Sequence, residues 1–284
     1  MSGSIIKTGL KRSGKEQFYT KSTIAKKCIE VFIKNVKPHK TNDTIIEPSA
    51  GAGSFNILLE GSFKFEKVYA YDIDPQSVSV QKQDFLKLSF DHFSKDYPIH
   101  IIGNPPFGRQ SKLARLFIKK SVELASTISF ILPKSFKKPS YQKTFPRHYH
   151  LLYQMDIPSN SFTIKNEVVD VPCVFQIWIK KEYERSQTPK IPNPINYSFI
   201  SKEDNPDFAI RRVGVYAGKV YTKTDDKSKQ SHYFIKLKND SHNEDFVNKI
   251  IHNYLSTASY DEDNTVGPRS ISKGELILQL NKCF

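Results

Sequence analysis

A six-residue segment that follows the apolar run 99–102 has the residue types needed to act on an amine. It reads Gly103-Asn104-Pro105-Pro106-Phe107-Gly108. The side-chain carbonyl of Asn104 and the backbone carbonyl of Pro105 are hydrogen-bond acceptors, and the two prolines fix the backbone that carries them. Two preorganised acceptors aimed at an exocyclic amine keep its lone pair available, and a phenyl ring gives a base a surface to stack on. The candidate catalytic residues are therefore Asn104, Pro105, Pro106 and Phe107.

A glycine-rich segment, Glu47-Pro48-Ser49-Ala50-Gly51-Ala52-Gly53-Ser54-Phe55, comes directly after the apolar run 44–46. Two glycines after a strand let the backbone turn tightly towards a ligand at the start of a helix. An acid at the end of the strand would repel a phosphate, so Glu47 favours a cofactor whose reactive end is cationic.

A second acidic segment follows about twenty residues after the glycines, where a Rossmann-type sheet places a carboxylate on ribose hydroxyls. Here the run 68–71 ends at Asp72, and Ile73 is placed to press on an adenine ring. Asp84 and Phe85 occupy the next strand end, where an acid can accept from an exocyclic amine and a ring can stack. Alone, each segment is also compatible with an ordinary turn, but their order favours a nucleoside cofactor.

Taken in order, five motifs resemble the S-adenosylmethionine-dependent N6-adenine DNA methyltransferases, over about residues 15–183: Gln17-Phe18-Tyr19-Thr20, EPSAGAGSF, YDIDP, QDF and GNPPFG. Their order is similar to that of the γ class, which has a recognition region at the C-terminus. The resemblance implies a cofactor site formed by Phe18, Tyr19, Thr20, Glu47, Pro48, Ser49, Ala50, Gly51, Gly53, Asp72, Ile73, Asp84, Phe85 and Asn104. It also implies that Phe107 and a second aromatic residue, for which Phe162 is the candidate, hold a flipped adenine.

Two other functions stay open. The final glycine of GNPPFG and the QFYT-like segment also resemble adenine methyltransferases that act on structured RNA. A non-catalytic nucleic-acid-binding specificity module would keep the same fold, although binding alone does not require the acceptors of the GNPPFG segment. A nicotinamide-dependent dehydrogenase is disfavoured because no G-x-G-x-x-G follows the first strand.

The charge distribution favours a polyanionic partner. The net charge is +14, and ten basic residues but a single acid, Glu123, fall within residues 105–150. DNA is the expected partner and RNA the alternative, with Arg109, Lys112 and Arg115 as candidate phosphate contacts beside the base pocket.

The pattern of short apolar runs alternating with helices predicts an α/β fold with a doubly wound, mostly parallel sheet. The resemblance implies that this is the seven-stranded sheet of Rossmann-like methyltransferases. Strands are expected near 45–46, 68–71, 99–102, 128–132 and 171–180, and helices over 22–35 and 111–125, with Leu113, Leu116, Phe117 and Leu124 facing inwards. The catalytic domain is expected to span residues 1–184. Residues 185–284 are expected to contain a small α+β target-recognition domain, which follows a proline-rich linker over 184–207. Its expected elements are strands at 208–222 and 232–238, a helix over 244–257 and a capping box from Ser272 to Glu275.

Composition excludes several other classes. The three cysteines are too widely spaced for a disulfide framework or a zinc knuckle, and no metal site is expected. No apolar run is long enough to span a membrane, and the N-terminal residues lack the apolar core of a secretory signal. An intracellular protein is expected, cytoplasmic if prokaryotic. The sequence leaves the oligomeric state open but favours a monomer, and a cognate restriction endonuclease is a candidate partner.

Overall fold

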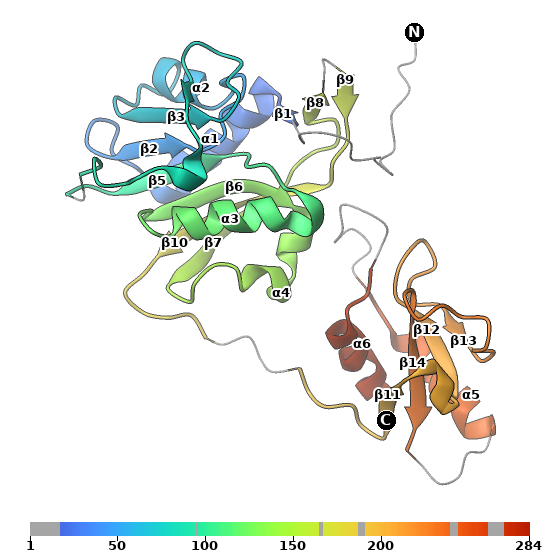
Figure 1. The fold of residues 1–284 in the computed structure, drawn as a ribbon. Coiled ribbons are helices and arrows are strands. Elements are labelled where there is room, and N and C mark those ends of the chain that lie inside the picture. Colours follow the sequence, from blue (N-terminus) through green and yellow to red (C-terminus); the bar gives the residue numbers. More distant parts are fainter. Residues whose placement is uncertain (1–17, 95, 165–166, 187–190, 239–243, 261–269) are drawn as a thin grey trace. The chain divides into compact units, whose positions relative to one another are not determined.

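The computed structural model describes residues 18–94, 96–164, 167–186, 191–238, 244–260 and 270–284 (Figure 1). The chain divides into two compact units, Met1–Gln187 and Thr188–Phe284. Within the described residues, no helix is both long and apolar enough to cross a membrane.

A seven-stranded sheet forms the centre of the first unit, in the order β4-β3-β2-β5-β6-β10-β7. Its first five strands are parallel, and β10 runs antiparallel to both β6 and β7. This confirms the predicted Rossmann-like α/β class. The strands are β2 (Thr44–Glu47), β3 (Val68–Asp72), β4 (Gln81–Lys82), β5 (Ile99–Gly103), β6 (Thr127–Pro133), β7 (Tyr149–Asp156) and β10 (Cys173–Lys180).

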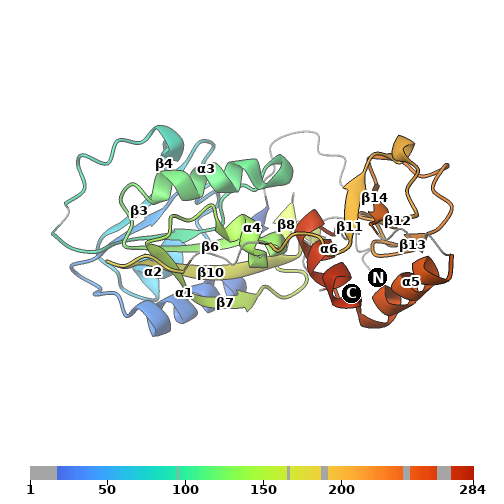
Figure 2. The same ribbon diagram turned by 90° about the horizontal axis from the view of Figure 1, so that it is seen from below.

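Helices cover both faces of this sheet. They are α1 (Ser22–Val36), α2 (Asn56–Gly61), α3 (Lys112–Ser121) and α4 (Pro139–Gln142). Figure 2 shows α3 on one face and α1 on the other. The sequence-based orientation of α3 was wrong in part. Its inward residues are Ala114, Phe117, Ile118 and Ser121. Leu113 and Leu116 are 37% and 39% exposed, because they lie beside the inward face, whose buried residues follow the spacing i, i+3, i+4 and i+7 from Ala114.

A second, three-stranded sheet brings the N-terminal segment against a hairpin from much later in the chain. It has the order β1-β8-β9, with β1 at Tyr19–Thr20, β8 at Phe162–Ile164 and β9 at Glu167–Val169. Tyr19 is opposite Thr163, and Thr20 is opposite Phe162. The first residues described are therefore held by hydrogen bonds to the hairpin.

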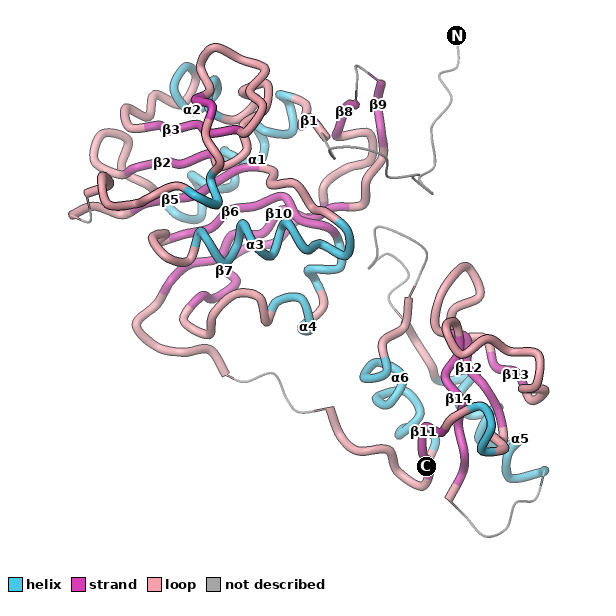
Figure 3. Tube along the Cα trace, in the orientation of Figure 1, coloured by secondary structure: helices cyan, strands magenta, loops and turns pink. Residues whose placement is uncertain are grey.

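The second unit is a four-stranded antiparallel sheet, in the order β11-β14-β12-β13, with two helices (Figure 3). Its elements are β11 (Tyr197–Ile200), β12 (Phe208–Arg211), β13 (Val220–Tyr221), β14 (His232–Leu237), α5 (Glu244–Thr257) and α6 (Lys273–Leu280). The capping box from Ser272 to Glu275 is present. Two expectations were wrong. The proposed strand 208–222 is a hairpin because the chain turns between β12 and β13, and the supposed linker contains β11, whose Tyr197 is buried in the core.

A buried polar cluster joins the amino-terminal ends of β2, β5 and β6. His100, at the start of β5, lies 3.0 Å through Nε2 from Asp43 Oδ2 and 2.8 Å through Nδ1 from Thr127 Oγ1. A neutral imidazole satisfies both contacts, donating to the carboxylate and accepting from the hydroxyl. Burial lowers the pKa of His100, although Asp43 acts in the opposite direction.

This cluster predicts a pH-dependent stability. The unfolded chain binds a proton at His100 more readily than the folded chain does, so the stability that His100 contributes falls as the pH drops below about 6.5. We expect the difference in unfolding free energy between the wild type and His100→Gln to shrink by up to about 1.4 kcal/mol per pH unit over that range. Urea denaturation at pH 7.5, 6.5 and 5.5 measures it, and a difference that does not change with pH would contradict the assignment.

Candidate active site

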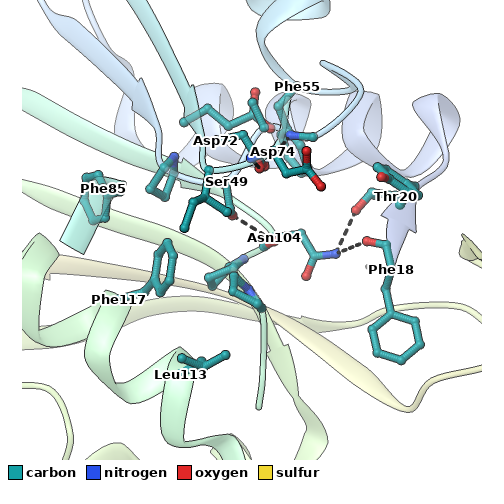
Figure 4. Close-up of a pocket in the computed structure, with 18 of the residues that line it drawn as sticks. Phe18, Thr20, Ser49, Phe55, Asp72, Asp74, Phe85, Asn104, Leu113 and Phe117 are labelled. Atoms are coloured by element: carbon teal, nitrogen blue, oxygen red, sulfur yellow. Dashed lines mark hydrogen bonds between the residues drawn. The ribbon is translucent and has the colours of Figure 1, made fainter. Parts of the chain in front are cut away.

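A pocket of about 370 Å³ lies in the first unit and is lined by residues that follow β2, β3 and β5 together with β1 and α3 (Figure 4). Carboxyl ends of parallel strands meet at one edge of a sheet, so the loops that follow them converge there. Of the residues expected to bind cofactor or perform catalysis, the pocket brings together Phe18, Tyr19, Thr20, Glu47, Pro48, Ser49, Ala50, Gly51, Asp72, Ile73, Asp84, Phe85, Asn104, Pro105, Pro106 and Phe107. Gln17 of the first motif lies outside the described residues.

Asn104 is held from two sides. Its Nδ2 donates to the carbonyl oxygen of Phe18 at 3.2 Å and to Oγ1 of Thr20 at 3.1 Å. Its backbone carbonyl accepts a hydrogen bond from Ser49 Oγ at 3.1 Å. Figure 4 shows the two bonds to Phe18 and Thr20 on one side of Asn104 and the bond from Ser49 on the other. Oδ1 is buried, and no described residue donates to it. A buried acceptor without a donor is costly, so an unpaired Oδ1 in a pocket indicates an acceptor for a ligand.

Glu47 is a buried acid at the end of β2. It is 2% exposed, and its Oε2 accepts the backbone N–H of Asn56, at the start of α2, at 2.8 Å. Burial raises the pKa of Glu47 to about 8, with the Asn56 N–H acting against this and the charge of Asp72 adding to it. The side chain is mostly protonated at neutral pH, and a cation bound beside it would favour the ionised form.

The glycine-rich loop is joined to β3 through Asp72. Asp72 Oδ2 accepts the N–H of Gly51 at 2.8 Å, and Oδ1 accepts the N–H of Asp74 at 2.8 Å. Gly51 has φ +54°, and a Cβ there would meet the Tyr19 ring at 3.0 Å. A larger residue would therefore strain the loop and push against β1, which is why the loop requires glycine at this position.

The side of the pocket beyond Asp72 is apolar. Ile73 is 63% exposed, while Phe85 is buried and stacks on Phe117 with ring centroids 5.6 Å apart. Asp84 lies beside them, and its Oδ1 accepts the backbone N–H of Leu86 at 3.0 Å. This side offers flat and aliphatic surfaces to a planar ring, with one carboxylate at its edge.

Several expected site residues do not reach the pocket lining. Gly53 lies in the loop but does not line the cavity. Arg109 and Lys112 are exposed just beyond Phe107, and Arg115 packs over the Tyr141 ring, 4.7 Å from its centroid.

Phe162 is 1% exposed and belongs to β8, so its ring is buried and unavailable for stacking on a base. The ring that does lie against Phe107 is Phe18, with centroids 6.2 Å apart and planes at 29°.

Sequence reasoning missed seven lining residues: Ser54, Phe55, Asp74, Gln83, Leu86, Leu113 and Phe117. The first four belong to the quoted motifs, so proximity to their neighbours could have identified them. Leu113 and Phe117 come from α3, and only their apolar character on one helix gave a signal.

These residues fit S-adenosylmethionine in chemical terms. The apolar side around Phe85 suits an adenine ring, Asp72 provides a carboxylate for ribose hydroxyls, and Glu47 provides a buried carboxyl group that would face a cationic group. The cofactor would be held by these residues, and it supplies an electrophilic methyl group when bound.

The raised pKa of Glu47 predicts a stability change opposite in sign to that of His100. The folded state holds this proton up to about pH 8, whereas the unfolded side chain loses it near 4.5. We expect the unfolding free energy of the wild type, relative to Glu47→Gln, to fall as the pH rises from 4.5 to 8, by at most about 1.4 kcal/mol per unit. Chemical denaturation of both proteins at pH 5, 6.5 and 8 measures this. If the unfolding free energies of the two proteins changed with pH in the same way, the pKa of Glu47 would not be raised in the folded protein.

The comparisons with solved structures return methyltransferases and a restriction enzyme at low identity. PH1948 from Pyrococcus horikoshii, described as a proposed RNA methyltransferase, is 15% identical, with a TM-score of 0.45 over 61% of this chain and 92% of that one. TrmN from Thermus thermophilus is 15% identical, with a TM-score of 0.39 over 56% of this chain and about half, 49%, of that one. The type IIG restriction endonuclease BpuSI is 18% identical, with a TM-score of 0.42 over 61% of this chain and 26% of that one. Likenesses this distant give no information on substrate.

No curated protein matches the chain. A family model described as "EDM2 methyltransferase-like domain" matches residues 39–187, which are 149 of the 284 residues. The matched range contains the glycine-rich loop, Asp72 and the segment from Gly103 to Gly108. The matched range is more than half of the chain, so the chain belongs to the family of EDM2 methyltransferase-like domains, and its cofactor is S-adenosylmethionine.

Proposed function

We propose that this methyltransferase transfers the methyl group to the N6 amine of adenine in nucleic acid. One observation carries the proposal: Asn104 Oδ1 is buried without a donor in the cofactor pocket, within a Gly103–Gly108 segment whose prolines fix the backbone. An amine has the N–H groups that such an acceptor requires. Most other methyl acceptors, such as a carboxylate, a thiolate or a carbanion, do not.

The residues of the segment have distinct roles in this mechanism. Asn104 Oδ1 and the Pro105 carbonyl accept the two N–H bonds of the amine, which reduces delocalisation of the nitrogen lone pair into the ring. Phe107 stacks on the base. Bound S-adenosylmethionine would supply the methyl group to this lone pair, and the proton of the methylated amine would leave to water. The reaction needs no covalent intermediate with the chain.

DNA is the acceptor that we favour, and the alternative is structured RNA. The γ-like motif order and the separate second unit support DNA, with residues 1–184 as the catalytic domain and residues 185–284 as a target-recognition domain. A cognate restriction endonuclease is then the expected partner. A base reaches the pocket only when it is single-stranded or flipped from a duplex, at a cost of about a few kcal/mol. A non-catalytic specificity module is the remaining alternative, and it is disfavoured by the unpaired acceptor.

Replacing Asn104 with Ala tests this assignment. The change removes an acceptor that acts on the amine, so kcat should fall by about 10²- to 10³-fold, as for other preorganised polar groups. Affinity for S-adenosylhomocysteine, measured by calorimetry, should stay within a few-fold of the wild type. Activity is measured as N6-methyladenine formed in adenine-containing DNA and RNA oligonucleotides, single-stranded and duplex. Asn42→Ala, in the loop before β2 and outside the pocket, is the control.

Turnover by Asn104→Ala close to that of wild type would remove Asn104 from the catalytic step. No N6-methyladenine on any of the four substrates would contradict adenine as the acceptor. Product on RNA alone would select the alternative acceptor.

The exposed basic residues beside Phe107 should contact the phosphates that flank the target. Arg109, Lys112 and Lys119 are exposed, whereas the guanidinium group of Arg115 packs over the Tyr141 ring. Each neutralised phosphate contributes a log–log salt slope of about −0.9 on duplex and −0.7 on single strands. Changing the three exposed residues to Ala should therefore reduce the slope by up to about three units, whatever the sequence of the nucleic acid.

A matched control lies on the opposite face of the sheet. Lys26, Lys27 and Lys34 of α1 are also exposed, and changing these three to Ala removes the same charge. Fluorescence anisotropy between 50 and 300 mM salt measures both slopes. Equal slopes for the two triple variants would show that nucleic acid approaches elsewhere.

A further inference from the structure

The side-chain amide of Asn104 has an orientation that its partners determine. The Phe18 carbonyl oxygen can only accept a hydrogen bond, so the amide nitrogen of Asn104 must face it. This places Nδ2 towards β1 and leaves Oδ1 as the unpaired atom. Rotating the amide by half a turn would bring two oxygens, Oδ1 and the Phe18 carbonyl, against each other.

Thr20 supplies the second partner of Nδ2. Its Oγ1 lies 3.1 Å from Nδ2 and is the only side-chain oxygen among the described residues with a hydrogen bond to this amide. With Phe18 and Thr20 both in place, each of the two N–H groups of the amide has its own acceptor. Without the Thr20 hydroxyl, one N–H of this partly buried amide would have no acceptor. The Phe18 carbonyl alone would then favour the observed orientation of the amide over the rotated one.

Thr20 itself is fixed by contacts that do not involve its hydroxyl. Its backbone carbonyl accepts a hydrogen bond from Ser54 Oγ at 2.8 Å, and its backbone is paired with Phe162 of β8. The residue is 7% exposed. The glycine-rich loop and the β8 hairpin therefore hold the backbone of Thr20, from which the hydroxyl group extends to Asn104.

We infer that Thr20 is a positioning residue for the acceptor amine: its hydroxyl holds the Asn104 amide so that Oδ1, and not Nδ2, faces the substrate. This inference rests on the proposed function, and it assigns to Thr20 a role other than the cofactor contact that its motif implies. An amide turned the wrong way would present N–H groups to the N–H groups of the amine and repel it. The hydroxyl would thus affect methyl transfer without touching either reactant.

The test compares Thr20→Val with Thr20→Ser. Valine keeps the shape of threonine and lacks the acceptor, while serine keeps the hydroxyl. We expect Thr20→Val to lower kcat by between about tenfold and a hundredfold, the range for a misplaced catalytic group. Thr20→Ser should retain most of the activity, and the affinity of both variants for S-adenosylhomocysteine should stay within about twofold of the wild type. Thr163→Val makes the same chemical change on β8, opposite Tyr19, and serves as the matched control.

A second readout does not depend on activity. In protein labelled with ¹⁵N-asparagine, the two Nδ2 proton resonances of Asn104 are identified by their loss in Asn104→Ala. The loss of a hydrogen bond in Thr20→Val should shift one of these resonances upfield, whereas Thr20→Ser and Thr163→Val should leave both near their wild-type positions. If Thr20→Val does not fold, as judged by its thermal melt, Thr20→Ala is used for both measurements.

The outcomes separate this inference from the proposed function. Unchanged Asn104 resonances and equal kcat for Thr20→Val and Thr20→Ser would overturn the inference while the function stands. A large loss of cofactor affinity with unchanged Asn104 resonances would also overturn it and return Thr20 to the cofactor site. A wild type that is inactive on adenine would overturn the function, and the resonances would still decide whether Thr20 orients the amide.

Discussion

Two hydrogen bonds from a single side-chain amide connect the parts of the pocket that come from distant segments. Asn104 follows β5, at the centre of the sheet, and its Nδ2 reaches the Phe18 carbonyl and the Thr20 hydroxyl in and beside β1. Ser49 of the glycine-rich loop holds its main chain at the same time. Because β1 is paired with β8, the amide also depends on a hairpin that contributes nothing to the pocket lining. The direction of the side-chain oxygen of Asn104 therefore depends on three separate segments: β1, the glycine-rich loop and the β8 hairpin.

The free protein keeps two polar groups in conditions that are unfavourable for them. Asn104 Oδ1 is buried without a donor, and Glu47 has a pKa raised to about 8 by burial. Both would be relieved by ligands with the opposite character, an N–H donor in one case and a cation in the other. Fixed groups of this kind are already oriented before a ligand binds, so little reorganisation is needed when it does.

The sequence was informative where the fold is repetitive. A parallel sheet brings the carboxyl ends of its strands to one edge, so the residues after β2, β3 and β5 could be placed in one pocket from spacing alone. Contacts that depend on antiparallel pairing gave no such signal. The family resemblance made Phe162 the candidate for a second base-stacking residue, but Phe162 of β8 pairs with Thr20 and its side chain is buried. The bond from Asn104 to Thr20 joins residues 84 positions apart, and no local pattern encodes it. On α3, apolar residues alone did not distinguish a core-facing side chain from Leu113, which lines the pocket.

The hydrogen bonds of the pocket range from 9 to 86 residues in sequence separation, so its two ends are expected to form at different stages of folding. Glu47 reaches Asn56 across 9 residues and Gly51 reaches Asp72 across 21, so the cofactor end closes through short loops. Phe18 and Thr20 reach Asn104 across 86 and 84 residues. Closing longer loops costs more entropy, and contacts of high separation form slowly. The cofactor end can therefore form while β1 is still detached. Conversely, a local opening that frees β1 in the folded protein would release the orientation of Asn104 and break the bond from Ser54 to Thr20, while the bonds from Glu47 to Asn56 and from Gly51 to Asp72 could remain.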